Sequence, residues 1–191
     1  KVLNSIPREN NFLITGRVLN LSGGTFAKTM LIDAGKKDGI EKGQPVISSD
    51  GLVGSIISVG PNSSRVLLLI DINSMIPIFL TQTGWPAIVQ GQNGYLLKVK
   101  FLSSEANPIN NEIIETSGHG GRFPPGINVG RMVKTSPSSY FVKLSADPQR
   151  LRFVSVISGS KFNSRKELPS GMAPLQNNKK WLNLKGFNKI N

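Results

Sequence analysis

The sequence contains no cysteine and a single histidine, His119, among 191 residues. The absence of cysteine excludes disulfide bonds and thiolate chemistry, and it leaves the cellular compartment open. One imidazole without a thiol offers too few ligands for a zinc site, and a histidine-based catalytic triad would depend entirely on His119. No serine lies in a Gly-x-Ser-Gly-Gly or Gly-x-Ser-x-Gly context. We therefore predict no catalytic residues, no metal ligands, no cofactor and no enzymatic activity.

Long hydrophobic runs and helical patterns are also missing. No stretch approaches the roughly 18 apolar residues of a membrane-spanning helix, and no window keeps apolar residues at helical spacing over three turns without a glycine or proline. The chain begins with Lys1 rather than methionine, and no charged-then-apolar leader precedes its first periodic segment. We expect a fragment or mature piece of a longer protein.

The net charge of +12 is unevenly distributed along the chain. Residues 161–191 carry seven basic side chains and one acid, whereas the first 160 residues carry 16 basic and ten acidic side chains. Such a basic tail favours anionic surfaces, such as phospholipid head groups, wall polymers or nucleic acid. We predict an irregular, disordered tail in preference to a short amphipathic membrane anchor.

Short segments rich in β-branched and apolar residues recur between turn residues, which is typical of antiparallel sheets. The pairs Asp38-Gly39, Asp50-Gly51 and Asn93-Gly94 supply the residues that tight turns with positive φ require. An all-β chain is predicted, with strands near residues 12–21, 29–33, 45–48, 52–59, 65–71, 75–81, 86–90, 95–102, 112–117, 127–134, 140–145 and 152–157.

The most distinctive stretch is residues 116–130, which read TSGHGGRFPPGINVG. Its five glycines permit positive φ, while Pro124 and Pro125 stiffen its exit and keep Phe123 out of helical conformation. The stretch lacks the G-x-x-x-x-G-K-[ST] spacing of a phosphate-binding loop, and no helix is predicted after it. We interpret it as a rigid structural connection.

This stretch resembles the TSG-x-G-G-x-FPPGI-x-VG signature of the rod-shape-determining protein MreC family. Further segments resemble the same family in the same order, so that the match covers approximately residues 12–157. Two departures are visible: Asn128 stands where the family usually has proline, and Asn111-Glu112 replaces the usual Gly-Asp. The matching segments are GRV at 16–18, LIDAG at 31–35, DGI at 38–40, KGQPV at 42–46, DGLVG at 50–54 and GPNSSRVLLLID at 60–71.

The resemblance implies two small antiparallel β-barrels of about six strands, the second inserted into the first. The first barrel is expected from residues 12–74 plus 131–160 and the second from residues 75–130, followed by the basic tail 161–191. Residues 1–11 would be a lead-in that follows a missing coiled coil and a missing N-terminal membrane helix. The chain would then lie at the periplasmic face of the inner membrane.

The same resemblance implies a scaffold of the cell-wall elongation complex that acts without catalysis. Family members associate with themselves, and they bind the elongation transpeptidase, penicillin-binding protein 2, and the membrane protein MreD. They thereby connect wall synthesis to the cytoplasmic MreB filaments. We expect recognition through exposed strand edges, by β-augmentation, or through apolar patches between the barrels.

The partner-binding residues that we predict lie in the second half of the chain. They are Phe123, Pro124 and Pro125, because a rigid apolar loop tip loses little entropy on binding. Phe123 has an equally good alternative, which is to fill the mouth of the barrel. Tyr140 and Phe141 must point to opposite sides of a strand, so one of them is a surface candidate.

A nucleic-acid-binding β-barrel is the alternative function, because the sequence pI is near 10.2. Single-strand binders combine basic grooves with exposed stacking aromatics. Here the aromatic residues lie in or beside apolar strands, where a barrel core would use them. We therefore expect no nucleic acid among the partners.

Overall fold

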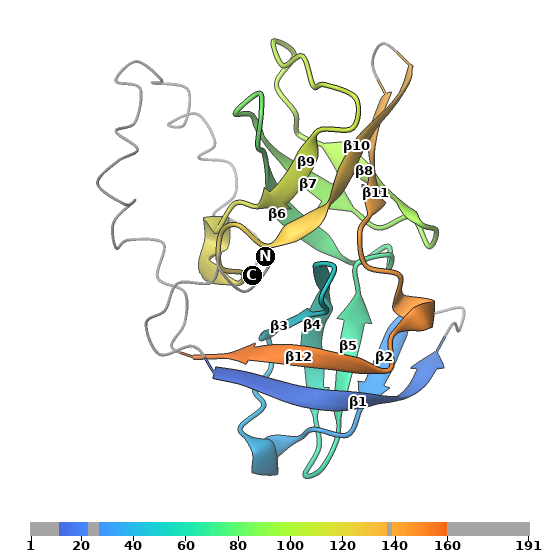
Figure 1. Ribbon diagram of the computed structural model, residues 1–191, viewed down its shortest axis with the longest axis vertical. Helices are drawn as coiled ribbons and strands as arrows, with labels where there is room; N and C mark the ends of the chain where they lie inside the picture. The colour runs from blue at the N-terminus through green and yellow to red at the C-terminus, as the bar shows by residue number, and fades with distance from the viewer. Residues whose placement is uncertain (1–11, 23–26, 137–138, 160–191) are drawn as a thin grey trace.

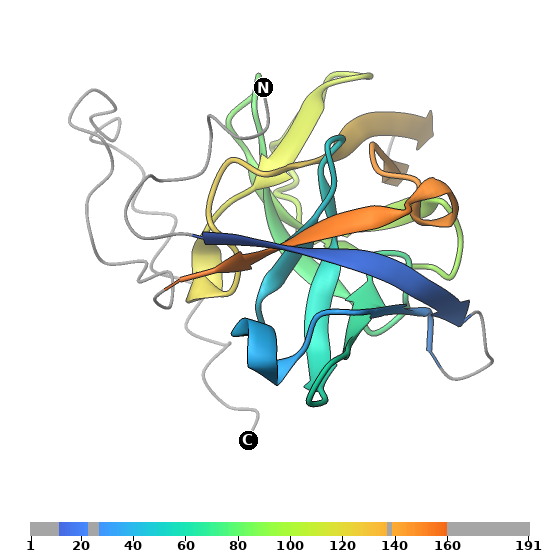
Figure 2. The same cartoon turned by 60° about the horizontal axis from the view of Figure 1, so that its bottom comes forward.

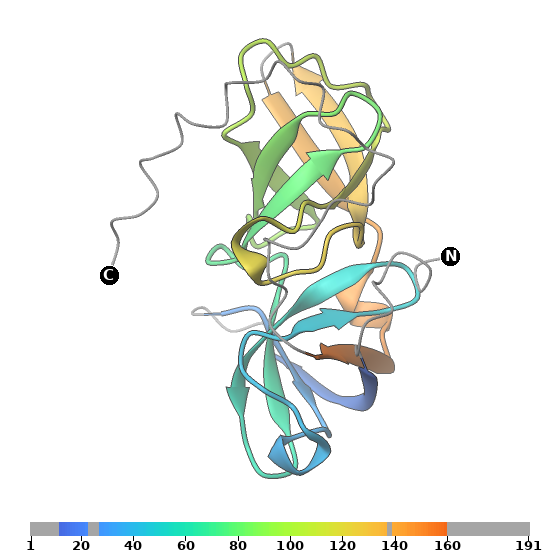
Figure 3. The ribbon, with the colours of Figure 1, turned by 90° about the vertical axis from the view of Figure 1, so that its left-hand side faces the viewer.

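The computed structural model describes residues 12–22, 27–136 and 139–159. The predicted lead-in 1–11 and the predicted basic tail 161–191 both lie outside these ranges. The described residues form two closed six-stranded antiparallel barrels, stacked along the long axis of the molecule (Figures 1 and 3). The all-β prediction and the predicted insertion of one barrel into the other are confirmed.

The first barrel has the strand order β1-β12-β3-β4-β5-β2, so its last strand arrives from the far end of the chain. Its inner side is filled by aliphatic side chains, among them Met30, Ile32, Val66 and Val156, all fully buried. The apolar and polar residues alternate in these strands because successive side chains point to opposite faces. The strands are β1 (Phe12–Ser22), β2 (Thr29–Ile32), β3 (Pro45–Ile47), β4 (Leu52–Val59), β5 (Ser64–Leu68) and β12 (Phe153–Ser158).

The second barrel has the strand order β10-β11-β8-β7-β6-β9 and is continuous in sequence. Ile78, Leu80, Val89, Ile114 and Val142 fill its interior without measurable exposure. Its strands are β6 (Met75–Leu80), β7 (Pro86–Gln90), β8 (Leu96–Lys100), β9 (Ile113–Thr116), β10 (Asn128–Ser136) and β11 (Ser139–Leu144).

The expected boundary between the barrels at residues 130 and 131 is wrong. Residues 131–136 continue β10, which pairs with β9 on one side and with β11 on the other. β11 in turn pairs with β8, as in the match of Val142 with Leu97. Both strands therefore close the second barrel, and the chain returns to the first barrel only with β12.

Turn chemistry explains where several strands end. Asp147 accepts a hydrogen bond from the Gln149 N–H at 3.0 Å and so begins the 3-10 turn η4 (Pro148–Arg150). Asn93 and Gly39 adopt positive φ at 59° and 84°, which agrees with the predicted turns. Asn111 does the same at φ 68°, so it preserves the left-handed conformation of the glycine usual in the family.

Two buried carboxylates hold loops against the barrels. Asp71 is 1% exposed and accepts hydrogen bonds from the N–H groups of Lys28 at 2.6 Å and Asn73 at 2.8 Å. Glu112 is fully buried and accepts from the N–H groups of Gln82 at 2.7 Å and Thr83 at 2.6 Å. Both carboxylates are thus satisfied structurally, as buried charge requires.

The two barrels share an apolar junction. Ile47, Leu52, Leu69 and Ile157 belong to the first barrel or its exit, yet they lie in the same buried cluster as the interior of the second barrel. Figure 3 shows how closely the β3–β4 turn approaches the upper barrel. This continuity makes the pair of barrels one packed unit, as expected where a hydrophobic interface joins two domains.

Asn128 adds hydrogen bonds across this junction. Its amide Nδ2 donates to the carbonyl of Asp50 at 2.9 Å and to Ser145 Oγ at 3.0 Å. Gly51, at φ 147°, lies so close that a Cβ there would stand 2.3 Å from the Asn128 carbonyl oxygen. The replacement of the family's proline by Asn128 thus supplies a contact between barrels that the sequence did not predict.

Candidate protein-interaction surfaces

The glycine-rich loop after β9 is a folded plug at the barrel junction. The Thr116 hydroxyl donates to the Pro124 carbonyl at 2.6 Å and accepts from the Ile127 N–H at 2.9 Å, which ties the two ends of the loop together. Gly118 adopts φ 77°, and a Cβ there would crowd the Pro125 ring at 3.2 Å. These contacts confirm a rigid connection, which includes one short 3-10 turn, η3 (His119–Gly121).

Phe123 does not project from this loop. Its side chain is 2% exposed and lies in the cluster that spans the junction and the second barrel. Pro124 is also buried, whereas Pro125 is exposed. The structure therefore shows the alternative in which Phe123 fills the barrel, and it contradicts the expectation that Phe123 and Pro124 form an exposed apolar tip.

Tyr140 and Phe141 point to opposite sides of β11, as predicted. Tyr140 packs against the interior of the second barrel, and Lys134 Nζ lies 5.7 Å from its ring centroid. Phe141 lies on the outer side, opposite Val133 and Lys98 in the neighbouring strands, and it is half-buried. Phe141 is thus the surface candidate of the two, and its role in binding stays a prediction.

Recognition by β-augmentation is not supported. Both sheets close into barrels within the described residues, so neither offers the row of unpaired backbone groups that an added strand needs. A partner would then have to contact side chains on the surface rather than backbone groups of a strand edge. The relevant surfaces are outer barrel faces and hollows between the barrels.

Several exposed apolar side chains lie on the first barrel, on strands that were predicted from the sequence but not considered as a binding surface. The side chains of Phe12, Leu13, Leu19 and Phe153 are 70%, 40%, 47% and 60% exposed. β1 and β12 pair along this face, and they cross in front of the first barrel, which is turned toward the viewer in Figure 2. Phe12 precedes Leu13 and so points to the other side of β1, and we name Leu13, Leu19 and Phe153 the β1–β12 face. The alternation of Leu13 and Leu19 with inward residues in 12–21 was the signal that could have identified it.

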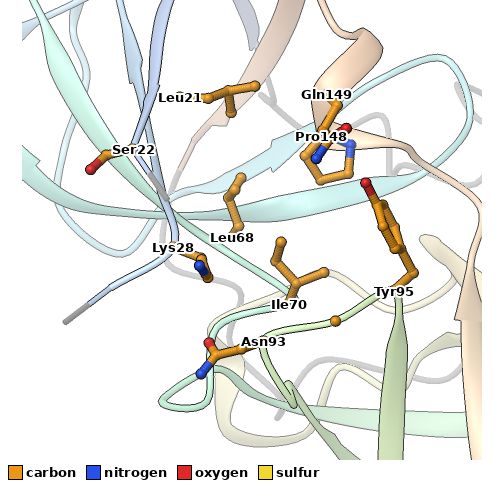
Figure 4. A pocket seen from close by; sticks show the side chains of 10 residues that line it. Leu21, Ser22, Lys28, Leu68, Ile70, Asn93, Tyr95, Pro148 and Gln149 are labelled. Carbon is orange, nitrogen blue, oxygen red and sulfur yellow. The ribbon is translucent and has the colours of Figure 1, made fainter. Parts of the chain in front are cut away.

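A hollow of about 490 Å³ lies between the barrels (Figure 4). Leu68 and Ile70 form its floor, and Tyr95, whose side chain is 53% exposed, stands at its side opposite Lys28. Its lining is mainly apolar with one cationic side chain. Such a hollow accommodates an apolar side chain of a partner more readily than a charged substrate.

His119 contacts a serine, but the geometry is that of a local turn. Its Nδ1 lies 3.0 Å from Ser117 Oγ, and its backbone N–H donates to the same oxygen at 3.3 Å. Serine side chains commonly bond the backbone two residues further on in loops. The side chain is exposed on the surface of the glycine-rich loop. Among the described residues, no group of three His, Cys, Asp or Glu side chains is placed to hold a metal ion.

The pKa of one carboxyl group, that of Glu115, is shifted. Burial raises the pKa of Glu115 above 4.5, because desolvation disfavours its charged form. The residue lies on β9 opposite Phe79 and Asn128, at the edge of the barrel junction. The shift follows from packing and does not indicate acid–base chemistry.

The comparisons with known proteins agree with one another. The family model described as rod shape-determining protein MreC, barrel core, matches residues 18–158. The cell shape-determining protein MreC of Caulobacter vibrioides is 38% identical over 146 residues, which are 76% of this chain and 42% of that relative. The chain therefore spans less than half the length of this curated relative.

Solved structures reproduce the two-barrel arrangement. The major periplasmic domain of the cell shape-determining filament MreC, in its monoclinic form, is 26% identical with a TM-score of 0.67, covering 78% of this chain and 99% of that chain. A chain from the complex between penicillin-binding protein 2 and MreC of Helicobacter pylori has a TM-score of 0.58, with the same coverage of both chains. Its identity is 13%, so it shows similarity of fold alone. Within the part of the chain described, no helix is long and apolar enough to cross a membrane.

Proposed function

Because the chain belongs to the rod shape-determining protein MreC family, we propose that it is a non-enzymatic scaffold of the cell-wall elongation complex. It maintains rod shape by associating with itself and by holding the wall-synthesis enzymes together. The observation that supports this best is the β1–β12 face, where large apolar side chains stand exposed on neighbouring strands. Exposed apolar surface of this kind is typical of protein interaction sites.

Penicillin-binding protein 2 is the partner that we propose first, since a structural relative forms a complex with that protein. MreD is a second partner, and MreB filaments are reached indirectly, both as the family resemblance implies. The proposed location is the periplasmic face of the inner membrane, in keeping with the periplasmic domain that this chain resembles. The anchor would be an N-terminal helix that precedes the barrels.

The proposed contacts differ from those expected from the sequence. Pro125 and Phe141 remain candidates because both have accessible surface. Phe123, Pro124 and Tyr140 act as supports, since their side chains or rings pack into the second barrel or its loop. The β1–β12 face is the principal site, because large apolar anchors dominate the energetics of protein interfaces.

Nucleic-acid binding is the less favoured alternative. Of the aromatic residues that might stack on bases, Trp85 and Tyr140 pack against the second barrel's interior. Base stacking needs exposed aromatic faces aligned along a basic groove. Phe153 is exposed, but the cation directly opposite it, Arg17, is paired with Asp33 at 3.2 Å.

A pull-down of penicillin-binding protein 2 from the same organism tests the proposal. The double variant L19S/F153S removes two exposed apolar side chains without touching the core, so we expect binding to fall at least about tenfold. I72S/I109S is the matched control, because Ile72 and Ile109 are 51% and 50% exposed in connecting segments outside β1 and β12.

Three outcomes separate the parts of the proposal. Loss of binding in L19S/F153S alone supports the β1–β12 face. Equal loss in both double variants, or in neither, rejects that face while leaving a scaffold possible through other surfaces. Failure of the unaltered chain to retain penicillin-binding protein 2, or to associate with itself in sedimentation, rejects the scaffold.

A further inference from the structure

A group of cationic side chains projects from the outer side of three neighbouring strands of the second barrel. β8, β11 and β10 lie next to one another, on the right of the upper barrel in Figure 1. Leu97, Val142 and Met132 point inward from these strands and are buried, so the residues flanking them point outward. We name the following residues the cationic face: Lys98, Lys100, Arg131 and Lys143.

Strand register concentrates these charges. Arg131 lies directly opposite Lys143, and Lys143 directly opposite Leu96. Like charges directly opposite each other destabilise an antiparallel pair, and the Arg131 guanidinium donates only to a neutral group, the Asn111 carbonyl, at 3.1 Å. None of the four side chains forms a salt bridge within the described residues. The nearby carboxylate of Glu112 is buried and bonded to backbone N–H groups.

Apolar and aromatic side chains border the same strand. Leu96 begins β8 and is 37% exposed, Tyr95 precedes the strand and is 53% exposed, and Phe101 follows its end with 62% exposed. Phe101 adopts φ 53°, a left-handed conformation that is unfavourable for a bulky aromatic residue. Backbone strain of this kind is commonly retained at binding sites.

The composition of the cationic face distinguishes between two kinds of anionic partner. Lysine is depleted in protein–protein interfaces relative to the rest of the surface, whereas arginine is enriched. Three of the four cations here are lysines, and exposed aromatic rings stand at both ends of β8. Lysines beside aromatic rings are typical of surfaces that lie on anionic membranes.

We propose that the cationic face binds the surface of a bilayer rich in anionic phospholipids. The four cations approach the head-group phosphates, and Phe101 enters the interfacial layer. This inference goes beyond the proposed scaffold function, because it assigns the second barrel a lipid contact of its own. The first barrel's β1–β12 face is left free for protein partners, whereas Phe141, which lies opposite Lys98 on the same outer side, then lies against the bilayer.

Sedimentation of the full chain with lipid vesicles tests the inference. Vesicles containing phosphatidylglycerol are compared with vesicles of phosphatidylcholine alone. Each lysine near an anionic surface contributes roughly fivefold in partitioning, so K98E/K143E is expected to lower it by about 25-fold or more. The matched control is K36E/K37E, which makes the same charge change at two exposed lysines of the first barrel.

The outcomes are decisive in either direction. Loss in K98E/K143E with retention in K36E/K37E supports the cationic face, and thermal unfolding of each variant confirms that both fold. If K98E/K143E does not fold, the neutral variant K98Q/K143Q replaces it, with about a 25-fold loss expected from the removal of two lysine charges. Equal loss in both charge variants, or no preference of the unaltered chain for phosphatidylglycerol, overturns the inference. The inference is also overturned if the unaltered chain binds immobilised polyglutamate and K98E/K143E loses that binding but still binds vesicles. The partner of the cationic face is then an acidic protein.

Discussion

Replacing Phe123 with alanine is expected to lower the free energy of unfolding by about 3–5 kcal/mol. The side chain is 2% exposed and lies among buried residues of both barrels. Its loss removes the transfer free energy of an aromatic ring, about 1.5–3 kcal/mol, and leaves a cavity. The loop cannot easily collapse into that cavity, since Thr116 bonds both Pro124 and Ile127. The full cost of the cavity should therefore appear in the free energy of unfolding.

Urea unfolding followed by tryptophan fluorescence measures this effect. Trp85 packs against the same cluster as Phe123 and reports on it directly. A domain of this size has a total stability of about 5–15 kcal/mol, so the variant should lose a large fraction of it. The thermal midpoint should fall by about 6–20 °C, given roughly 2–4 °C for each kcal/mol.

The matched control is Pro125→Ala, two positions further along the same loop. Pro125 is exposed, so its replacement should cost less than about 1 kcal/mol, mainly through the unfolded state. The reasoning is refuted if Phe123→Ala stays within about 1 kcal/mol of the unaltered chain while binding to penicillin-binding protein 2 falls. That result would mean that Phe123 is an exposed anchor after all.

Three further changes test the junction and the buried carboxyl groups. Gly51→Ala should destabilise the chain by more than about 2 kcal/mol and increase proteolysis between the barrels, because its Cβ would meet the Asn128 carbonyl; unchanged stability contradicts the described approach. Glu112→Ala should cost at least about 3 kcal/mol in urea unfolding, since it leaves the N–H groups of Gln82 and Thr83 unpaired; a cost below about 1 kcal/mol would contradict that role. The pKa of Glu115 is raised in the folded state, so the unaltered chain should lose stability as pH rises from 4.5 through that higher value. Glu115→Gln should remove this loss, and unfolding curves of equal pH dependence for both chains would show that the pKa is not raised.

The sequence predicted the elements of this fold well because their signals are local. All twelve predicted strands are present, and β4 and β7 have the predicted bounds. The turn at Asp147-Pro148 is indicated by the side-chain oxygen atoms of Asp147, which can accept a backbone hydrogen bond. The turn at Asn93-Gly94 is indicated by residues that tolerate positive φ. Such signals depend only on neighbouring residues.

What the sequence could not provide is which strands pair and which apolar residues are covered. The boundary at residue 130 was wrong because the pairing of β10 with β9 and β11 is a long-range choice that periodicity does not encode. Phe123 reads equally well as a tip or a plug until the junction cluster is known. The β1–β12 face was missed for the converse reason, since Leu19 and Phe153 look like ordinary strand residues until their exposure is known.

Because the chain returns to the first barrel only with β12, the two barrels are completed in a fixed order during synthesis. The second barrel is contiguous and complete once β11 has emerged, whereas the first waits for β12, the last of the described strands to be made. Until then β1 and β3 lack the neighbour that joins them, so two sheet edges stand open to incorrect pairing. A nascent chain stopped before Phe153 would thus carry one finished barrel and one prone to aggregation, which makes the final strand the step that commits the molecule to its native state.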